Sequence, residues 1–176
     1  GATTRITELI TQGLSSKLEA ERKKGKKTTR FAIVRFGNVL GSSGSVIPLF
    51  QNQIETGGPM TITHPEVTRY FMTISEATQL VLQAGSIGDK CNVFVLNMGE
   101  PVSILNLAKQ MIYASGHKLK KNNKEGDESG IDIQFIGLQK GEKIHEELFI
   151  GEHFSATEHP KIIKSQEDFC SSEEAD

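Results

Sequence analysis

The feature that most constrains the fold of this chain is an apolar segment at 31–34 that leads into a glycine- and serine-rich turn at 37–45. An uninterrupted apolar run of this kind is typical of a strand buried on both faces of a parallel sheet. After the turn, Ile47, Phe50 and Ile54 are spaced as one face of an amphipathic helix. This order predicts a helix N-terminus that can bind a phosphate, although glycine and serine also form ordinary turns.

Helices and strands alternate along the rest of the chain. An amphipathic helix is predicted ahead of the first strand, with charge on one face and an apolar face made of Ile6, Leu9, Ile10, Leu14 and Leu18. Strands are predicted at 60–63, 69–74, 93–96 and 131–136, and helices at 75–84, 103–112 (with Ser103 as N-cap) and 144–149. The alternation predicts an α/β fold with a parallel sheet. Because long strands are few and the chain begins inside a helix, we expect the second part of a larger domain.

Composition narrows the classes of protein to consider. The 176 residues suffice for one core, and a formal net charge of −2 gives no reason to expect a nucleic acid as partner. No apolar segment is long enough for a membrane span or a secretory signal, so we expect a cytoplasmic protein. Cys91 and Cys170 match no metal or redox spacing, so we expect reduced thiols and no metal. A charged surface insertion is predicted at 118–130 and a fraying acidic tail at 164–176.

Four separated motifs carry a resemblance to one family. They are FGNVLGS at 36–42 with GSVIP at 44–48, THPEVTRYFM at 63–72, FVLNMGEPV at 94–102 and GEKIHEEL at 141–148. In this order and spacing, they resemble motifs of the nucleotide-sugar 4,6-dehydratases of bacterial polysaccharide biosynthesis. Those enzymes are extended short-chain dehydrogenase/reductases related to the UDP-N-acetylglucosamine 4,6-dehydratases. The resemblance covers about residues 1–163.

The resemblance implies a Rossmann-type fold of two parts, in which an N-terminal half binds NAD or NADP and a smaller C-terminal portion binds the nucleotide sugar. The fingerprint of the first half, G-x-x-G-x-x-G, is absent from this chain. The chain therefore resembles the C-terminal portion alone, with the catalytic acid and base groups expected upstream of Gly1. We expect this portion to be inactive by itself and to pair with the missing half or form a homo-oligomer. For the full-length parent, the inner face of the membrane is a second expected location.

Candidate ligand residues lie within the motifs. Asn38 stands at the carboxyl end of the first strand, where α/β sheets bind ligands, although an asparagine there also caps its own turn. The Arg69 guanidinium suits a diphosphate through two parallel hydrogen bonds, or else forms a buried ion pair with Glu66 or Glu76. Ser45 is an N-cap, a phosphate ligand, or both.

The resemblance assigns further residues to the substrate: Ser42, Val46, Thr61, Thr63 and Glu142. Glu142 would accept both ribose hydroxyls, or it is simply an acid favoured at a helix N-terminus. The two threonines flank a strand that resembles the family's nucleobase-contacting edge, although exposed strand threonines are common. Phe36 is assigned to the cofactor.

Several positions depart from the family pattern or carry no expected role. Thr4 stands where the family has a lysine that helps to set proton transfer, so either other groups do this chemistry or this copy is impaired. Ser43 and Gln139 each stand where the family has an arginine. Lys140 restores a positive charge beside the second of these, without the guanidinium fork. The histidines lack triad or metal spacing, and those at 145, on a predicted helix, and 159 are expected to be structural.

The implied activity is the dehydration of a UDP-sugar to a 4-keto-6-deoxy sugar, with NAD(P) carrying the hydride. In that reaction this chain would supply sugar and diphosphate contacts. Three alternatives stay open: a nucleotide-sugar epimerase of the same superfamily, a nucleotide-sugar-binding module without redox chemistry, and an assembly fragment whose sheet edge pairs with another chain.

Overall fold

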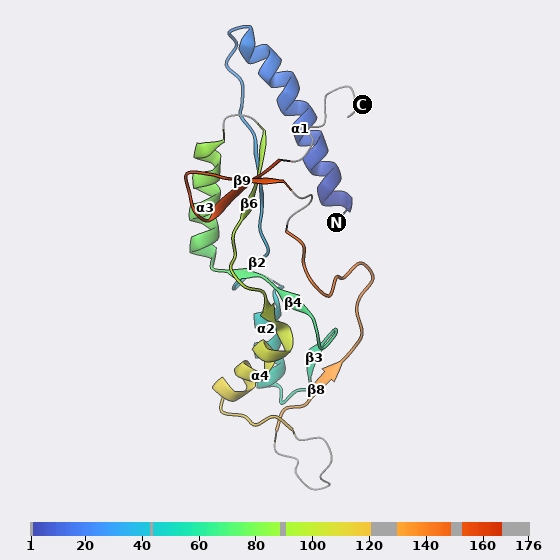
Figure 1. The fold of residues 1–176 in the computed structure, drawn as a ribbon. Coiled ribbons are helices and arrows are strands. Elements are labelled where there is room, and N and C mark those ends of the chain that lie inside the picture. Colours follow the sequence, from blue (N-terminus) through green and yellow to red (C-terminus); the bar gives the residue numbers. More distant parts are fainter. Residues whose placement is uncertain (1, 43, 89–90, 121–129, 149–152, 167–176) are drawn as a thin grey trace. The chain divides into compact units, whose positions relative to one another are not determined.

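A computed structural model describes residues 2–42, 44–88, 91–120, 130–148 and 153–166 of the chain. The helices are α1 (Ala2–Lys23), α2 (Val46–Glu55), α3 (Ile74–Ile87) and α4 (Ile104–Ala114). The strands are β1 (Ala32–Arg35), β2 (Asn38–Val39), β3 (Met60–Ile62), β4 (Thr68–Arg69), β5 (Phe71–Met72), β6 (Asn92–Leu96), β7 (Val102–Ser103), β8 (Ile133–Phe135), β9 (Phe154–Ala156) and β10 (Ile162–Ser165). The chain divides into two compact units (Figure 1). Unit 1 comprises Gly1–Phe36, Ser75–Asn97 and Glu147–Asp176, and unit 2 comprises Gly37–Ile74 and Met98–Glu146.

Unit 1 is built on a four-stranded sheet with strand order β1-β6-β10-β9. β1 runs parallel to β6, with Val34 opposite Phe94, whereas β10 is antiparallel to both β6 and β9. α1 and α3 flank these strands (Figure 1). The predicted α/β fold with a parallel strand pair is confirmed, while β9 and β10 are additions that the apolar pattern did not indicate.

The strand that is fully buried is β6 rather than β1. Phe94, Val95 and Leu96 of β6 are at most 1% exposed, whereas all four residues of β1 are only half-buried. The prediction that 31–34 is buried on both faces is therefore wrong for this structure. The reason is position, because β1 lies at the end of the strand order and β6 lies inside it.

Helix α1 turns a polar face toward the rest of unit 1. Much of its apolar stripe is exposed, with Ile6 at 57% and Ile10 at 59%, whereas Glu8 and Gln12 are buried at 6% and 2%. The inversion has a local cause: Arg35 Nε donates to Glu8 Oε1 at 2.7 Å, and Arg35 Nη2 donates to Glu8 Oε2 at 2.6 Å. A two-pronged ion pair between α1 and β1 thus takes the place of an apolar contact.

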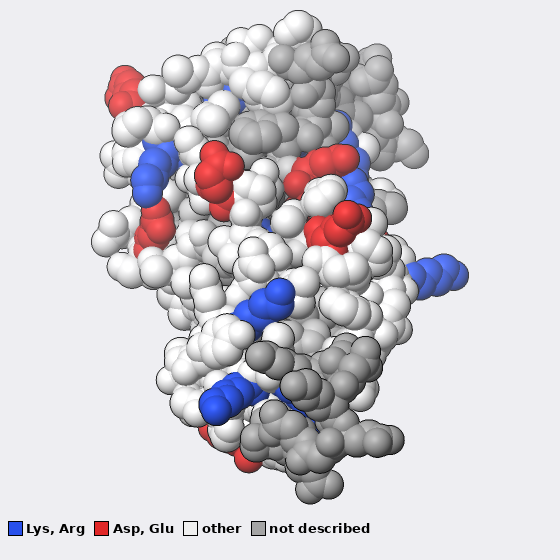
Figure 2. Space-filling view, turned by 60° about the horizontal axis from the view of Figure 1, so that its bottom comes forward, with Lys and Arg blue, Asp and Glu red and all other residues white. Residues whose placement is uncertain are grey.

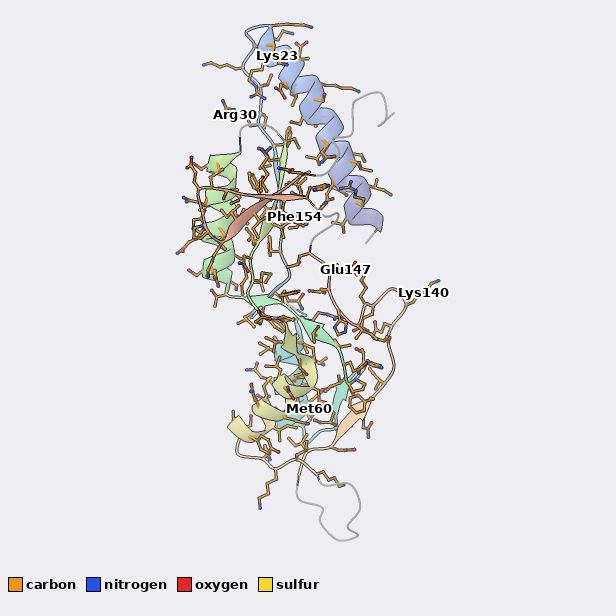
Figure 3. All side chains as sticks on the ribbon, in the orientation of Figure 1. Lys23, Arg30, Met60, Lys140, Glu147 and Phe154 are labelled. Atoms are coloured by element: carbon orange, nitrogen blue, oxygen red, sulfur yellow. The ribbon has the colours of Figure 1, made fainter. Side chains whose placement is uncertain are left out.

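Unit 2 consists of α2, α4 and three two-stranded sheets. β2 pairs with β5 and β3 with β8, both in parallel, and β4 pairs antiparallel with β7. The predicted strand 69–74 is divided at Tyr70, because the residues before and after it pair with different partners. The core is apolar and includes Met60 at 0% exposure (labelled in Figure 3); its members are Phe50, Ile54, Met60, Ile62, Val67, Ile104, Ala108, Ile112 and Ile131.

The helix predictions have mixed outcomes. Phe50 and Ile54 of α2 are buried as predicted, and Ser103 caps α4 by accepting a hydrogen bond from Asn106 N. The predicted helix at 144–149 is wrong, because 144–148 is not helical and Ile144 O instead accepts from Thr68 N at 3.0 Å. Residue 149 lies outside the described residues.

Two predicted surface segments lie mostly outside the described residues. Residues 121–129 of the insertion and 167–176 of the tail are not described, and β10 extends to Ser165, so the first two residues of the predicted tail belong to the sheet. Among the helices of the described part of the chain, none combines the length and apolar character needed to cross a membrane.

We expect Glu8→Gln to lower the free energy of unfolding at pH 7 by about 3 kcal/mol, because Arg35 would lose its buried partner. The hydrogen bond from Arg35 is the main cause that holds the pKa of Glu8 below its usual 4.5, and Arg5 adds to the effect against the opposing effect of burial. The stabilisation from this carboxylate is therefore present above pH 4.5 and is lost as the pH falls through the lowered pKa of the folded state.

Urea unfolding over a pH series measures this difference. The matched control is Glu158→Gln, which removes the same charge from an exposed position in unit 1. A gap between Glu8→Gln and the unsubstituted chain that does not narrow in acid would contradict the account.

Candidate ligand-binding site

The predicted ligand residue Asn38 is fixed by its backbone. Asn38 N donates to Tyr70 O at 2.8 Å, and Leu40 N donates to Met72 O at 2.9 Å. Gly37 makes this approach possible, because a Cβ there would lie 3.0 Å from Tyr70 Cβ and 3.1 Å from Tyr70 O. Asn38 is thereby brought beside the residue that directly follows Arg69.

The Arg69 guanidinium is the centre of a dense polar cluster in unit 2. Its Nη1 donates to Thr68 O at 2.8 Å and to Ile144 O at 3.1 Å, and its Nη2 donates to Glu142 Oε1 at 3.1 Å. Its Nε lies 3.5 Å from Glu146 Oε1, and its side chain is only 13% exposed. The predicted ion pair exists, but with different acids. Glu76 bonds to Lys161, and Glu66 faces no basic group in the described ion pairs.

Glu142 is held from three directions. Besides the bond from Arg69, its Oε1 accepts from Thr63 Oγ1 at 2.8 Å and its Oε2 accepts from Gln139 N at 3.1 Å. Three residues that the resemblance assigned to the substrate, Thr63, Arg69 and Glu142, therefore meet in one place. The alternative of an acid at a helix N-terminus does not apply, because 142–148 is not helical.

The N-terminus of α2 carries an unused hydroxyl. Ser45 has the extended backbone of an N-cap residue, with φ −75° and ψ 164°, yet its side chain makes no capping hydrogen bond. Its Oγ is buried without a partner among the described residues. Gly41 and Gly44, at φ +78° and +74°, shape the turn before it. Ser45 is thus an N-cap residue by position, without the capping hydrogen bond.

The other assigned residues of unit 2 have ordinary structural surroundings. Thr61 Oγ1 accepts from Gln53 Nε2 at 2.8 Å, and Thr61 N donates to Gln53 Oε1 at 3.1 Å. Ser42 is exposed, and Val46 is half-buried and packs against the core. Lys140 is exposed and extends outward from its turn (Figure 3). Ser43 lies outside the described residues.

Unit 1 has a separate open pocket of about 580 Å³ between α1 and β1. Thr4, at the position of the family lysine, and Phe36, assigned to the cofactor, both line it. Its charged lining residues, Glu8 and Arg35, bond to each other. Thr11 Oγ1 donates to Thr7 O at 2.8 Å. This lining can accept hydrogen bonds and pack against a flat ring, but it offers no ammonium group.

The remaining titratable side chains show no catalytic arrangement in the described ranges. His145 Nδ1 lies 2.9 Å from Thr68 Oγ1, His64 Nδ1 accepts from Glu66 N and His159 Nδ1 accepts from Lys161 N. Burial raises the pKa of the Cys91 thiol. No group of three or more acidic, histidine or cysteine side chains that could hold a metal is found among the described residues. On the face in Figure 2, basic and acidic side chains are interspersed.

Sequence reasoning missed Glu146 and the Glu8–Arg35 pair. Glu146 belongs to the GEKIHEEL motif, so the motif was a signal that could have found it. The segment was instead predicted as a helix, and no role was given to Glu146. Glu8 and Arg35 are 27 residues apart, and only the packing of α1 on β1 brings them together.

Comparisons with known proteins agree on one family. The polysaccharide biosynthesis protein family matches residues 1–167. The chain is 54% identical over 148 residues to the capsular polysaccharide biosynthesis protein CapD of Staphylococcus aureus, covering 84% of this chain and 22% of that protein. It is 36% identical over 138 residues to a UDP-glucose 4-epimerase of Rickettsia canadensis, covering 78% of this chain and 36% of that protein.

The matching solved structures are also longer than this chain. The structure of Pen from Bacillus thuringiensis is 41% identical with a TM-score of 0.60, and the match covers 76% of this chain and 38% of that one. A UDP-N-acetylglucosamine 4-epimerase from Methanobrevibacter ruminantium, solved with UDP-N-acetylmuramic acid, shares the fold at 19% identity, with a TM-score of 0.52 and coverage of 76% and 41%. The matches thus cover 22–41% of the length of these relatives.

We expect Gly37→Ala to destabilise the chain by about 1–3 kcal/mol, because the added methyl group would press on the Tyr70 backbone and Cβ. Gly85→Ala is the matched control: that position lies in α3 with no atom within 4 Å of the added Cβ, so the same change should be neutral or stabilising. Thermal unfolding of both variants tests this, and equal melting temperatures would show that the close approach at Gly37 is not constraining.

Proposed function

Because the chain belongs to the polysaccharide biosynthesis protein family, we propose that it supplies the nucleotide-sugar-binding portion of an enzyme that modifies a UDP-sugar. The favoured reaction is 4,6-dehydration of a UDP-N-acetylglucosamine-type sugar. The observation that carries the proposal is the meeting of Thr63, Arg69 and Glu142 in one cluster, with Asn38 held beside Tyr70.

Each of these residues suits a different chemical group of a nucleotide sugar. The Arg69 guanidinium binds the diphosphate, for which its charge and planar fork are suited. Glu142, with one Oε2 acceptor position beyond its bond to Gln139 N, accepts a ribose hydroxyl. The Asn38 amide donates to a sugar or phosphate oxygen, and the Ser45 hydroxyl donates to phosphate at the start of α2.

The nicotinamide cofactor would be held mainly by residues outside this chain. In the family reaction, NAD or NADP accepts and returns a hydride. The 176 residues contain no dinucleotide fingerprint, and the pocket around Thr4 and Phe36 offers hydroxyls and one ring but no ammonium group. These residues do not make a dinucleotide site by themselves, so no chemical step is assigned to this chain.

Epimerisation is the second candidate reaction. The observation that favours it is the 36% identity to a UDP-glucose 4-epimerase over most of this chain. Both reactions use the same contacts to the nucleotide and the diphosphate, so these residues do not separate them.

We expect the purified chain to bind UDP-N-acetylglucosamine in a calorimetric titration, and Asn38→Ala and Arg69→Ala to weaken this binding at least about tenfold, because each removes a hydrogen bond to a charged or polar ligand group. Arg30→Ala, which removes the same charge from an exposed position, is the control and should leave affinity unchanged. Absence of heat from the unsubstituted chain would end the proposal of an independently competent site. Equal affinity in all variants would show that other residues bind the ligand.

Product mass separates the two reactions in a longer protein that contains this sequence. Dehydration should give a nucleotide sugar lighter by one water, whereas epimerisation should give one of unchanged mass. We expect the loss of water, and unchanged mass with a changed sugar configuration would favour the epimerase instead.

A further inference from the structure

The two carboxylates at Arg69 are held very unequally. Glu142 accepts from Arg69 Nη2, Thr63 Oγ1 and Gln139 N at 2.8–3.1 Å. Glu146 is joined to the cluster by one long contact, the 3.5 Å between its Oε1 and Arg69 Nε. Glu142 is therefore part of the framework, whereas Glu146 is the weakly attached member.

The second oxygen of Glu146 is in an unfavourable place. Its Oε2 is buried without a hydrogen-bond partner among the described residues. A carboxylate oxygen that has lost water and gained no donor is costly, more so than a neutral acceptor. What keeps Glu146 there is the charge of Arg69, which two acids now share.

The local charge around Arg69 disfavours a bound diphosphate while both Glu142 and Glu146 are present. One guanidinium against two carboxylates is already an excess of one negative charge, and a diphosphate would add more negative charge at the same cation. Repulsion between such an anion and the two carboxylates favours the release of one acid, and the bonds to Glu142 make Glu146 the more easily released of the two.

We propose that Glu146 is a placeholder: in the ligand-free chain it occupies the Nε side of Arg69, and the diphosphate of the ligand displaces it. This rests on the proposed function, because it takes Arg69 as the diphosphate-binding residue. The Nη1 bonds of Arg69 to Thr68 O and Ile144 O do not involve Glu146, so the guanidinium keeps its position when Glu146 turns out to water. Glu146 lies in a non-helical segment, and its own side chain is 29% exposed, which gives it a route to solvent.

The decisive experiment is a titration of UDP into Glu146→Gln and Glu146→Ala. A ligand contact or a support for Arg69 would be weakened by these changes, but removal of a competing anion should tighten UDP binding about fivefold. Inorganic pyrophosphate should show the same gain, because the diphosphate is the competing group. Glu66→Gln, which removes one charge from an exposed turn of the same unit, should stay within about twofold of the unsubstituted chain and controls for overall charge.

The outcomes separate this inference from the function on which it rests. UDP binding that Arg69→Ala abolishes, but that Glu146→Gln leaves unchanged or weakens, would overturn the placeholder and keep the diphosphate site. If UDP does not bind any variant, the proposed function fails, and the displacement of Glu146 by a diphosphate fails with it. Urea unfolding of the ligand-free chain tests separately whether Glu146 has a structural role. The placeholder predicts an unchanged midpoint for Glu146→Gln and a lower one for Glu142→Gln. An equal fall in both would show that Glu146 is structural.

Discussion

The Arg69 guanidinium is the interaction on which unit 2 depends. It joins β4 to the segment around Ile144 through the backbone carbonyl of Ile144, and it joins the same strand to Glu142 through an ion pair. Because the side chain is only 13% exposed, removing one partner would leave the other charge buried and unpaired, which costs more than breaking a surface pair. The segment that carries Glu142 has no helix to stabilise it, so this cation does what regular backbone hydrogen bonding does elsewhere in the unit.

Unit 1 shows a comparable substitution of charge for apolar packing. Glu8 and Arg35 join α1 to β1, and Gln12 is buried nearby on the same helix face. The apolar side chains of Ile6 and Ile10 are left toward solvent as a result. A buried pair of this kind adds little net stability compared with apolar packing, but its two hydrogen bonds are made only where Glu8 faces Arg35.

The sequence predicted what depends on local pattern and missed what depends on distant partners. α2 and the Ser103 cap follow from apolar spacing and from the side-chain oxygen of a single residue, and both are found. The short helix at 144–149 was predicted from apolar spacing, but the bond from Thr68 N to Ile144 O competes with helical hydrogen bonding there. The convergence of Thr63 and Glu142 spans 79 residues, so only the family resemblance, and no periodicity, could place both at one ligand.

Tyr70, between β4 and β5, has one more consequence. The strand before it pairs with β7 and the strand after it pairs with β2, so a single residue separates the backbone that carries Arg69 from the backbone that holds Asn38. The spacing between the backbone positions of Arg69 and Asn38 is thus set by the pairing of these strands. Substitution of Arg69 or Asn38 would leave this spacing unchanged. Insertion of one residue at Tyr70 would instead reverse the face of the strand on which the side chains of β5 lie.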